Sequence, residues 1–238
     1  MESNTNQIQV DKGMKIALCL SGQVRCFEKC WPTIYAYVIK PLNCDVFFHT
    51  WEKGDLKPGL ADSFISQDRP IPEYPTLDYN YMQMLLDKIK PKSHLIQKQV
   101  EFNIDNITSL WEPGITFRIF SMYYSIAQSM ALVSNYEFNN NFVYDCVIRC
   151  RFDCLFRKPL NIEDYDLKYI WAPQFHEINI GDQIAISGSA NMKIYSLMFN
   201  HLSHFLHFCG PEESISNFLR LMGVQFRYLP NDLYFLER

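Results

Sequence analysis

The charged residues near position 150 have the types and spacing that phosphate chemistry requires. Within residues 144–156 the charged side chains fall at positions 145, 149, 151 and 153, and alternate residues of a strand share a face. A strand here would have one charged face, made of Asp145, Arg149, Arg151 and Asp153. Guanidinium groups bind phosphate oxygens, and a carboxylate binds a divalent cation. The pattern predicts a diphosphate site with a metal ion at Asp153; the alternative is a buried arginine–aspartate network that only holds loops in place.

Three polar residues and a glycine follow the short apolar run at 15–20: Ser21, Gly22, Gln23 and Arg25. Ligands of parallel sheets bind beyond the carboxyl ends of the strands. Glycine lets a ligand approach the backbone closely, the hydroxyl and amide can form hydrogen bonds, and the arginine carries charge. We expect this loop to bind a nucleotide, although an ordinary turn and helix cap would have similar residues.

His49 and Trp51 come at the end of the next apolar run, residues 45–49. In a parallel sheet this end adjoins the first loop, and an aromatic side chain there could stack on a base. A tryptophan buried in a corner of the core is an equally ordinary explanation. Both residues are candidates for substrate binding.

Polar residues also recur at helical spacing in residues 117–136, which have the length and periodicity of a helix. Arg118, Ser121 and Tyr124 or Ser125 would form a polar stripe on this otherwise apolar helix. The stripe either borders the nucleotide cleft or is a solvated face.

Asp182 and Gln183 follow Gly181 between two apolar stretches. An acid at the end of a sheet could deprotonate an acceptor hydroxyl, or it could cap a turn. Asp182 is the first candidate for a catalytic base, with Glu212 the second. His201, His204 and His207 are not expected to bind a metal, because their spacing spreads them around a helix.

These residues need a sheet to position them. A strand, loop, helix and second strand within thirty-five residues form a βαβ unit, which favours an α/β sheet with the N-terminal strand at its centre. The expected strands are residues 15–20, 45–49, 93–97, 144–156, 169–172, 182–186 and 224–229. The expected helices are residues 27–38, ended by Pro41, and 79–88, 117–136, 191–208 and 212–222. Residues 52–75 are expected to be a long loop.

Composition limits the classes of protein. The 238 residues, 48% hydrophobic and 20% charged, fit one domain over 14–238 after a polar tail at 1–13. A net charge of -4 without long basic runs disfavours nucleic acid as a partner. Without an apolar leader or membrane span, we expect a cytoplasmic protein whose eight cysteines are free thiols. No Walker A, GxGxxG, HExxH or GxSxG motif is present.

Several segments in order resemble a family of GT-A-type nucleotide-sugar glycosyltransferases of bacteria and large DNA viruses. They cover most of the chain after residue 14: KIALCLSGQVRCFEKCWPTI, CDVFFHTW, FRIFSMYYSI, YDCVIRCRFDCLF, GDQIAISGSANMKIY, PEESISNFLRLMGV and residues 234–238. The resemblance implies a GT-A-like (Rossmann-like) three-layer α/β/α sandwich with a mostly parallel central sheet. It also implies a donor bound over the first two strands, with Asp153 holding Mn²⁺ or Mg²⁺ and Asp182 near the acceptor. Arg151 stands where the first acid of an Asp-x-Asp pattern would be, so an arginine could itself neutralise the diphosphate.

The sequence therefore predicts an enzyme that transfers a sugar from a nucleoside-diphosphate sugar to a glycan acceptor. Two alternatives use the same diphosphate site. A sugar-nucleotide hydrolase or nucleotidyltransferase would need no acceptor groove, and a glycan- or nucleotide-binding module would show no turnover. The base and sugar of the donor, the acceptor and the stereochemistry are left open.

Overall fold

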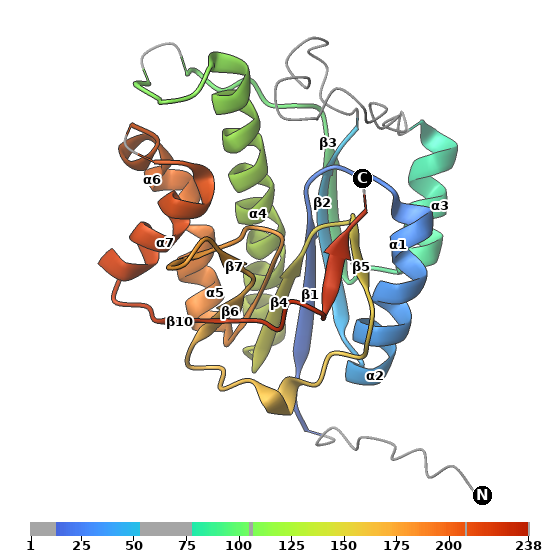
Figure 1. The fold of residues 1–238 in the computed structure, drawn as a ribbon. Coiled ribbons are helices and arrows are strands. Elements are labelled where there is room, and N and C mark those ends of the chain that lie inside the picture. The colour runs from blue at the N-terminus through green and yellow to red at the C-terminus, as the bar shows by residue number, and fades with distance from the viewer. Residues whose placement is uncertain (1–12, 53–77, 105–106, 208, 238) are drawn as a thin grey trace, which may run out of the picture.

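A seven-stranded sheet runs through the centre of the protein (Figure 1), in a computed structural model that describes residues 13–52, 78–104, 107–207 and 209–237. The strand order is β10–β6–β9–β4–β1–β2–β3. The bounds are β1 (Ile16–Ser21), β2 (Asp45–Trp51), β3 (Ser93–Gln97), β4 (Cys146–Cys150), β6 (Ile170–Ala172), β9 (Ile184–Ser187) and β10 (Phe226–Tyr228). Six strands run parallel to a neighbour, whereas β9 is antiparallel to both β4 and β6. The prediction of a mostly parallel sheet is confirmed, but the central strand is β4, and the first strand, expected at the centre, lies next to it.

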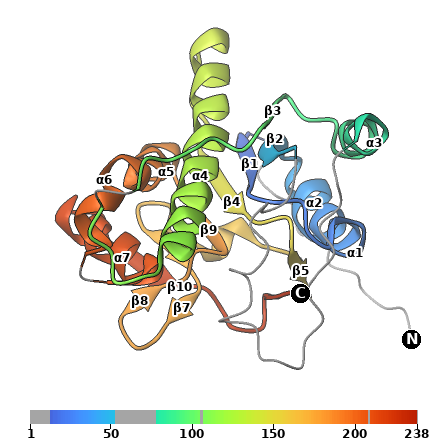
Figure 2. The same ribbon diagram turned by 90° about the horizontal axis from the view of Figure 1, so that it is seen from above.

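Helices pack on both faces of the sheet (Figure 2). One face carries α1 (Phe27–Ile34), a π-helical turn (Tyr35–Ile39), α2 (Lys40–Leu42) and α3 (Tyr79–Ile89). The other carries α4 (Pro113–Asn140), α5 (Ser189–Ser196), α6 (Met198–Phe205) and α7 (Pro211–Leu221). In β1, Leu18 and Leu20 enter the core beneath α1, and Ala17 and Cys19 enter the core beneath α4. A strand covered on both faces explains the uninterrupted apolar run at its position.

The connections leave β1 and β4 in opposite directions. From β1 the chain passes through α1 to β2 and then to β3, at one edge of the sheet, and α4 returns it to β4 on the other side of β1. The carboxyl ends of β1 and β4 therefore flank a topological switch point, where open α/β sheets bind their ligands. This topology brings residues 21–25 beside residues 149–153.

The expected strand over 144–156 is wrong in its middle. The backbone turns after Cys150, and β5 (Cys154–Phe156) pairs with β11 (Tyr234–Leu236) in a separate antiparallel ribbon. The last backbone hydrogen bond between this segment and the β9 segment runs from the N–H of Arg151 to the carbonyl of Gln183. Arg151 and Asp153 therefore lie in a turn and not on one face of a strand.

Other expectations differ at the ends of elements. The helix expected over 191–208 is two helices, α5 and α6, that meet at Leu197, and the first helix continues through Pro41 until Asn43, which adopts the left-handed conformation. The chain also forms a short 3-10 helix (Ile162–Asp164) and a hairpin of β7 (Gln174–Phe175) and β8 (Asn179–Ile180). The expected loop at 52–75 and the tail at 1–13 lie almost wholly outside the described residues.

All eight cysteines are free thiols, as expected. In the described part of the chain, no helix has the length and apolar character needed to cross a membrane.

Candidate functional site

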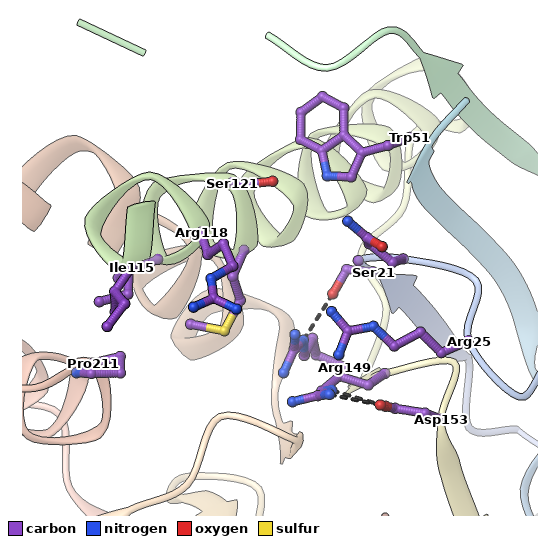
Figure 3. Close-up of a pocket in the computed structure, with 14 residues that line it drawn as sticks. Ser21, Arg25, Trp51, Ile115, Arg118, Ser121, Arg149, Asp153 and Pro211 are labelled. Atoms are coloured by element: carbon purple, nitrogen blue, oxygen red, sulfur yellow. Dashed lines mark hydrogen bonds and ion pairs between the residues drawn. The ribbon is translucent and has the colours of Figure 1, made fainter. Parts of the chain in front are cut away.

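A pocket lies at the carboxyl end of the sheet, between the loop after β1 and the first turns of α4 and α7 (Figure 3). Its volume is about 200 Å³. Among the described residues, four arginines and one carboxylate line it. The charged and polar lining residues are Ser21, Gln23, Arg25, Arg118, Ser121, Arg149, Arg151 and Asp153, with Gly22, Trp51, Ile115, Ile119, Met122 and Pro211 completing the wall. The excess of cationic groups suits an anionic ligand.

Arg149 is the most deeply placed of these cations, with 2% of its surface exposed. Its Nε donates a hydrogen bond to the hydroxyl of Ser21 at 2.9 Å, which fixes the direction of the guanidinium. Its Nη1 is buried and has no hydrogen-bond partner among the described residues. A buried N–H group without a partner is costly, and a bound anion would satisfy it.

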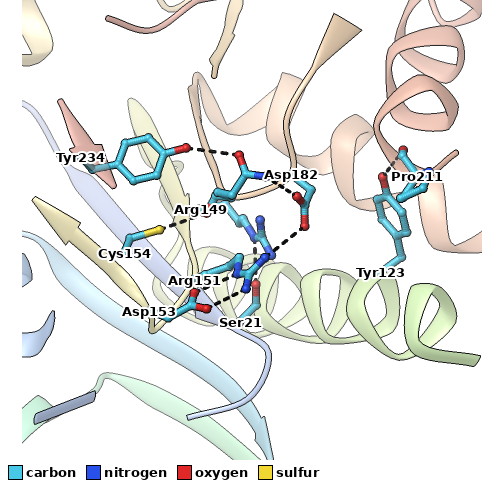
Figure 4. Close-up of polar contacts among 10 residues, drawn as sticks. Ser21, Tyr123, Arg149, Arg151, Asp153, Cys154, Asp182, Pro211 and Tyr234 are labelled. Atoms are coloured by element: carbon cyan, nitrogen blue, oxygen red, sulfur yellow. Dashed lines mark hydrogen bonds and ion pairs between the residues drawn. The ribbon is translucent and has the colours of Figure 1, made fainter. Parts of the chain in front are cut away.

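Arg151 is held by two carboxylates (Figure 4). Its Nε and Nη2 donate to the two oxygens of Asp153 at 2.9 and 2.6 Å, and its Nη1 lies 3.8 Å from Asp182. Burial alone would lower the pKa of Arg151, but the charges of Asp153 and Asp182 outweigh it, so the pKa is raised. The guanidinium therefore remains charged and oriented beside the pocket.

The same contacts bear on the predicted metal ion. Both oxygens of Asp153 are taken by Arg151, and the carboxylate is only 1% exposed. Across the described ranges, no three His, Cys, Asp or Glu side chains converge in a way that could hold a metal ion. The residues present do not fit Mn²⁺ or Mg²⁺, because a guanidinium already occupies the position beside the acid.

Ser125, which helical spacing did not distinguish from Tyr124, shapes the loop after β1. The backbone N–H of Gly22 donates to the hydroxyl of Ser125, on α4, at 2.6 Å, and that hydroxyl also contacts Nδ1 of His49 at 2.7 Å. Gly22 has a φ of 105°, a conformation that favours glycine. Ser125 therefore ties the loop to both the second strand and the long helix.

His49 and Tyr124, both predicted to bind substrate, are not among the described residues that line the pocket. His49 is fully buried, and its ring meets Trp51 and Tyr124 edge to face. Burial lowers the pKa of His49 to about 4, so the imidazole is neutral. The two residues support the loop and α4, because α4 packs directly over the end of β2.

Trp51 does line the pocket, but it is only 2% exposed and stacks on Tyr124. This burial leaves little ring surface for the expected base stacking. Ser121 also lines the pocket, and its hydroxyl donates to Gln99 at 3.2 Å.

Asp182 and Gln183 lie beside the pocket, next to Arg151. The amide of Gln183 donates to Asp182 at 2.7 Å and accepts from the hydroxyl of Tyr234 at 3.2 Å (Figure 4). Asp182 is 5% exposed and reaches the pocket through its contact with Arg151.

No family model matches the chain, and no curated protein is significantly similar to it. The resemblance noted above therefore rests on the quoted segments alone.

Proposed function

We propose that this protein is a GT-A-like glycosyltransferase that moves a sugar from a nucleoside-diphosphate sugar to a glycan acceptor. The observation that carries the proposal is the unpaired, buried Nη1 of Arg149 in a pocket lined by four arginines. The pocket lies at the switch point of a mostly parallel sheet, where nucleotides bind in other folds of this class. Helices on both faces of that sheet are compatible with the three-layer arrangement of the GT-A type.

The main chemical demand of such a transfer is to stabilise the departing diphosphate. Negative charge grows on its oxygens as the bond to the anomeric carbon breaks. Arg149, fixed by Ser21, and Arg151, fixed by Asp153, would donate to these oxygens without first having to reorganise. We infer that the two guanidinium groups do the work that a metal ion does in metal-dependent enzymes of this type.

The size of the cavity limits what it holds. Whole small-molecule sites usually have about 300 to 1,000 Å³, and this pocket has about 200 Å³. The pocket would therefore enclose the diphosphate, and the nucleoside and sugar would extend from it. Gly22, which has no side chain, lets the diphosphate approach the loop backbone.

Turnover of nucleotide sugars tests the proposal. The full chain is incubated with a panel of nucleoside-diphosphate sugars, with and without glycan acceptors, and the released nucleoside diphosphate is measured. We expect release that requires an acceptor and that falls by about 10² to 10³ in Arg149→Met, as when one oriented donor is lost. Release of nucleoside diphosphate at the same rate with and without acceptor would identify a hydrolase instead. Binding of the donor without release would identify a binding module.

A further inference from the structure

Glu212 lies next to the pocket, close enough to Asp182 and Arg151 to feel their charges. It is the second residue of α7 and follows Pro211, which lines the pocket wall. Figure 3 shows Pro211 facing Ser21 and Asp153 across the cavity. The carbonyl of Pro211 accepts a hydrogen bond from the hydroxyl of Tyr123 at 2.8 Å, which anchors the start of α7 to α4 (Figure 4). The backbone at Glu212 is therefore fixed beside the site.

The carboxyl group of Glu212 is half-buried, and its one hydrogen bond within the described ranges is with its own backbone. Its neighbour Glu213 is instead exposed, and it accepts from the backbone N–H of Gly210. Asp182 differs too, since one of its oxygens accepts from Gln183 and the other faces Arg151. Among the described residues, Glu212 is thus a half-buried carboxyl group beside the pocket that, unlike Asp182, is not held by another side chain.

Several charged and titratable groups surround Glu212. Asp182 reaches it from the loop before β9, Arg151 from the turn after β4, and Glu213 from its own helix, and the hydroxyls of Tyr123 on α4 and Tyr195 on α5 are also near. Burial, followed by the charge of Asp182, raises the pKa of Glu212 to about 7. Two neighbouring carboxyl groups whose environments differ in this way are typical of acid–base pairs in enzymes.

We propose that Glu212 is the base that accepts the proton of the acceptor hydroxyl, and that Asp182 is a positioning residue that sets its charge. The inference rests on the transferase proposed above. The acceptor oxygen forms a bond to the anomeric carbon as the bond from that carbon to the diphosphate oxygen breaks. The electron pair leaves with the nucleoside diphosphate, beside Arg149 and Arg151, and the acceptor proton moves to a carboxylate oxygen of Glu212. A single displacement of this kind inverts the anomeric configuration.

The test compares Glu212→Gln, Glu212→Asp and Asp182→Asn with the matched control Glu213→Gln. Turnover is measured from pH 5 to 9, and donor affinity is measured separately by calorimetry at pH 8. Glu212→Gln should lose at least about 10² of turnover with unchanged donor affinity, whereas Glu213→Gln should behave as wild type. In wild type kcat/KM should fall below about pH 7, where Glu212 becomes protonated. Removing the charge at Asp182 lowers the pKa of Glu212, so in Asp182→Asn this fall should move to lower pH.

The outcomes separate this inference from the function it rests on. If wild type turns over donor but Glu212→Gln keeps its activity, or the product retains the anomeric configuration, Glu212 is not the base and the transferase stands. If the fall of kcat/KM at low pH occurs at the same pH in Asp182→Asn as in wild type, Asp182 does not have the positioning role. If wild type consumes no nucleotide sugar, the proposed function fails and this inference fails with it. Partial activity in Glu212→Asp, with kcat/KM still falling at low pH, supports Glu212 as the base.

Discussion

Arg151 and Asp153 form a buried pair whose two members depend on each other. Asp153 is 1% exposed, and the side chain of Arg151 donates a hydrogen bond to each oxygen of its carboxylate. Removing one member of such a pair leaves an uncompensated buried charge, which costs about 3 to 5 kcal/mol. Replacing both members with neutral residues of similar size avoids that cost at Asp153, and Asp182, the other carboxylate near Arg151, keeps its hydrogen bond from Gln183. Stability and function can therefore be separated at this pair.

We expect Arg151→Met to lower the free energy of unfolding by about 3 kcal/mol, and Arg151→Met/Asp153→Asn to recover most of it. The double variant should nevertheless lose about 2 to 4 kcal/mol of transition-state stabilisation, because the cation is absent. Urea unfolding measures the first quantity, and turnover of the folded double variant measures the second. Wild-type turnover in the double variant would mean that the pair only holds the turn in place.

His49 should make the protein less stable in acid. Its pKa is about 4 in the folded protein and about 6.5 in the unfolded chain, so between these values the unfolded state binds more protons. Stability therefore falls as the pH drops from about 6.5 to 4, by about 3 kcal/mol for this group. Urea unfolding of wild type and His49→Asn over this range isolates the effect. Parallel curves for the two proteins would show that His49 does not titrate in this way.

Residue types near the site were easier to predict than their contacts. Arg149, Arg151 and Asp153 do lie together, but the turn that joins the last two depends on β5 pairing with β11, about eighty residues further on. Local alternation could not show that change of sheet. The burial of His49 and Trp51 likewise depends on how α4 is rotated over β2, which decides that Ser125 faces the loop. Helical spacing alone leaves Tyr124 and Ser125 equivalent.

At the scale of elements, α4 holds the loop after β1 through one hydroxyl. We expect Ser125→Ala to weaken donor binding by about tenfold, or about 1.4 kcal/mol, because the N–H of Gly22 loses its acceptor. Ser129→Ala is the matched control, since Ser129 is buried one turn further along α4 and its hydroxyl donates within that helix, to Ile126. Calorimetric titration of both variants with the same nucleotide makes the comparison. Equal affinity in the two variants would show that the loop keeps its shape without Ser125.

Most elements were predictable, and the exceptions have local causes. Apolar runs predicted the strands and helices near the site, because each of these elements buries at least one face. Turn residues at their ends predicted where they stop. The direction of β9 was not predictable, since an apolar run of four residues reads the same in parallel and antiparallel sheets. The break at Leu197 was missed because neither glycine nor proline marks it.

At the scale of the whole molecule, the sheet order explains why the site lies where it does. Residues 21–25, 118–125, 149–153 and 211 are far apart in the chain and converge only because β1 and β4 are neighbours with connections that diverge. The sequence indicated the class of sheet and most residues of the site. Glu212 was a candidate from the sequence, but only the tertiary arrangement shows that Pro211, beside it, forms part of the pocket wall.

The most direct test of the central claim is calorimetric titration of the full chain with nucleoside diphosphates and monophosphates in a buffer that contains EDTA. The arginine pocket predicts saturable binding of at least one nucleoside diphosphate without metal, at least about tenfold tighter than the monophosphate, which equals about 1.4 kcal/mol. In Arg149→Met this preference for the second phosphate should disappear. No nucleotide binding, or a diphosphate preference that persists in Arg149→Met, would contradict the account.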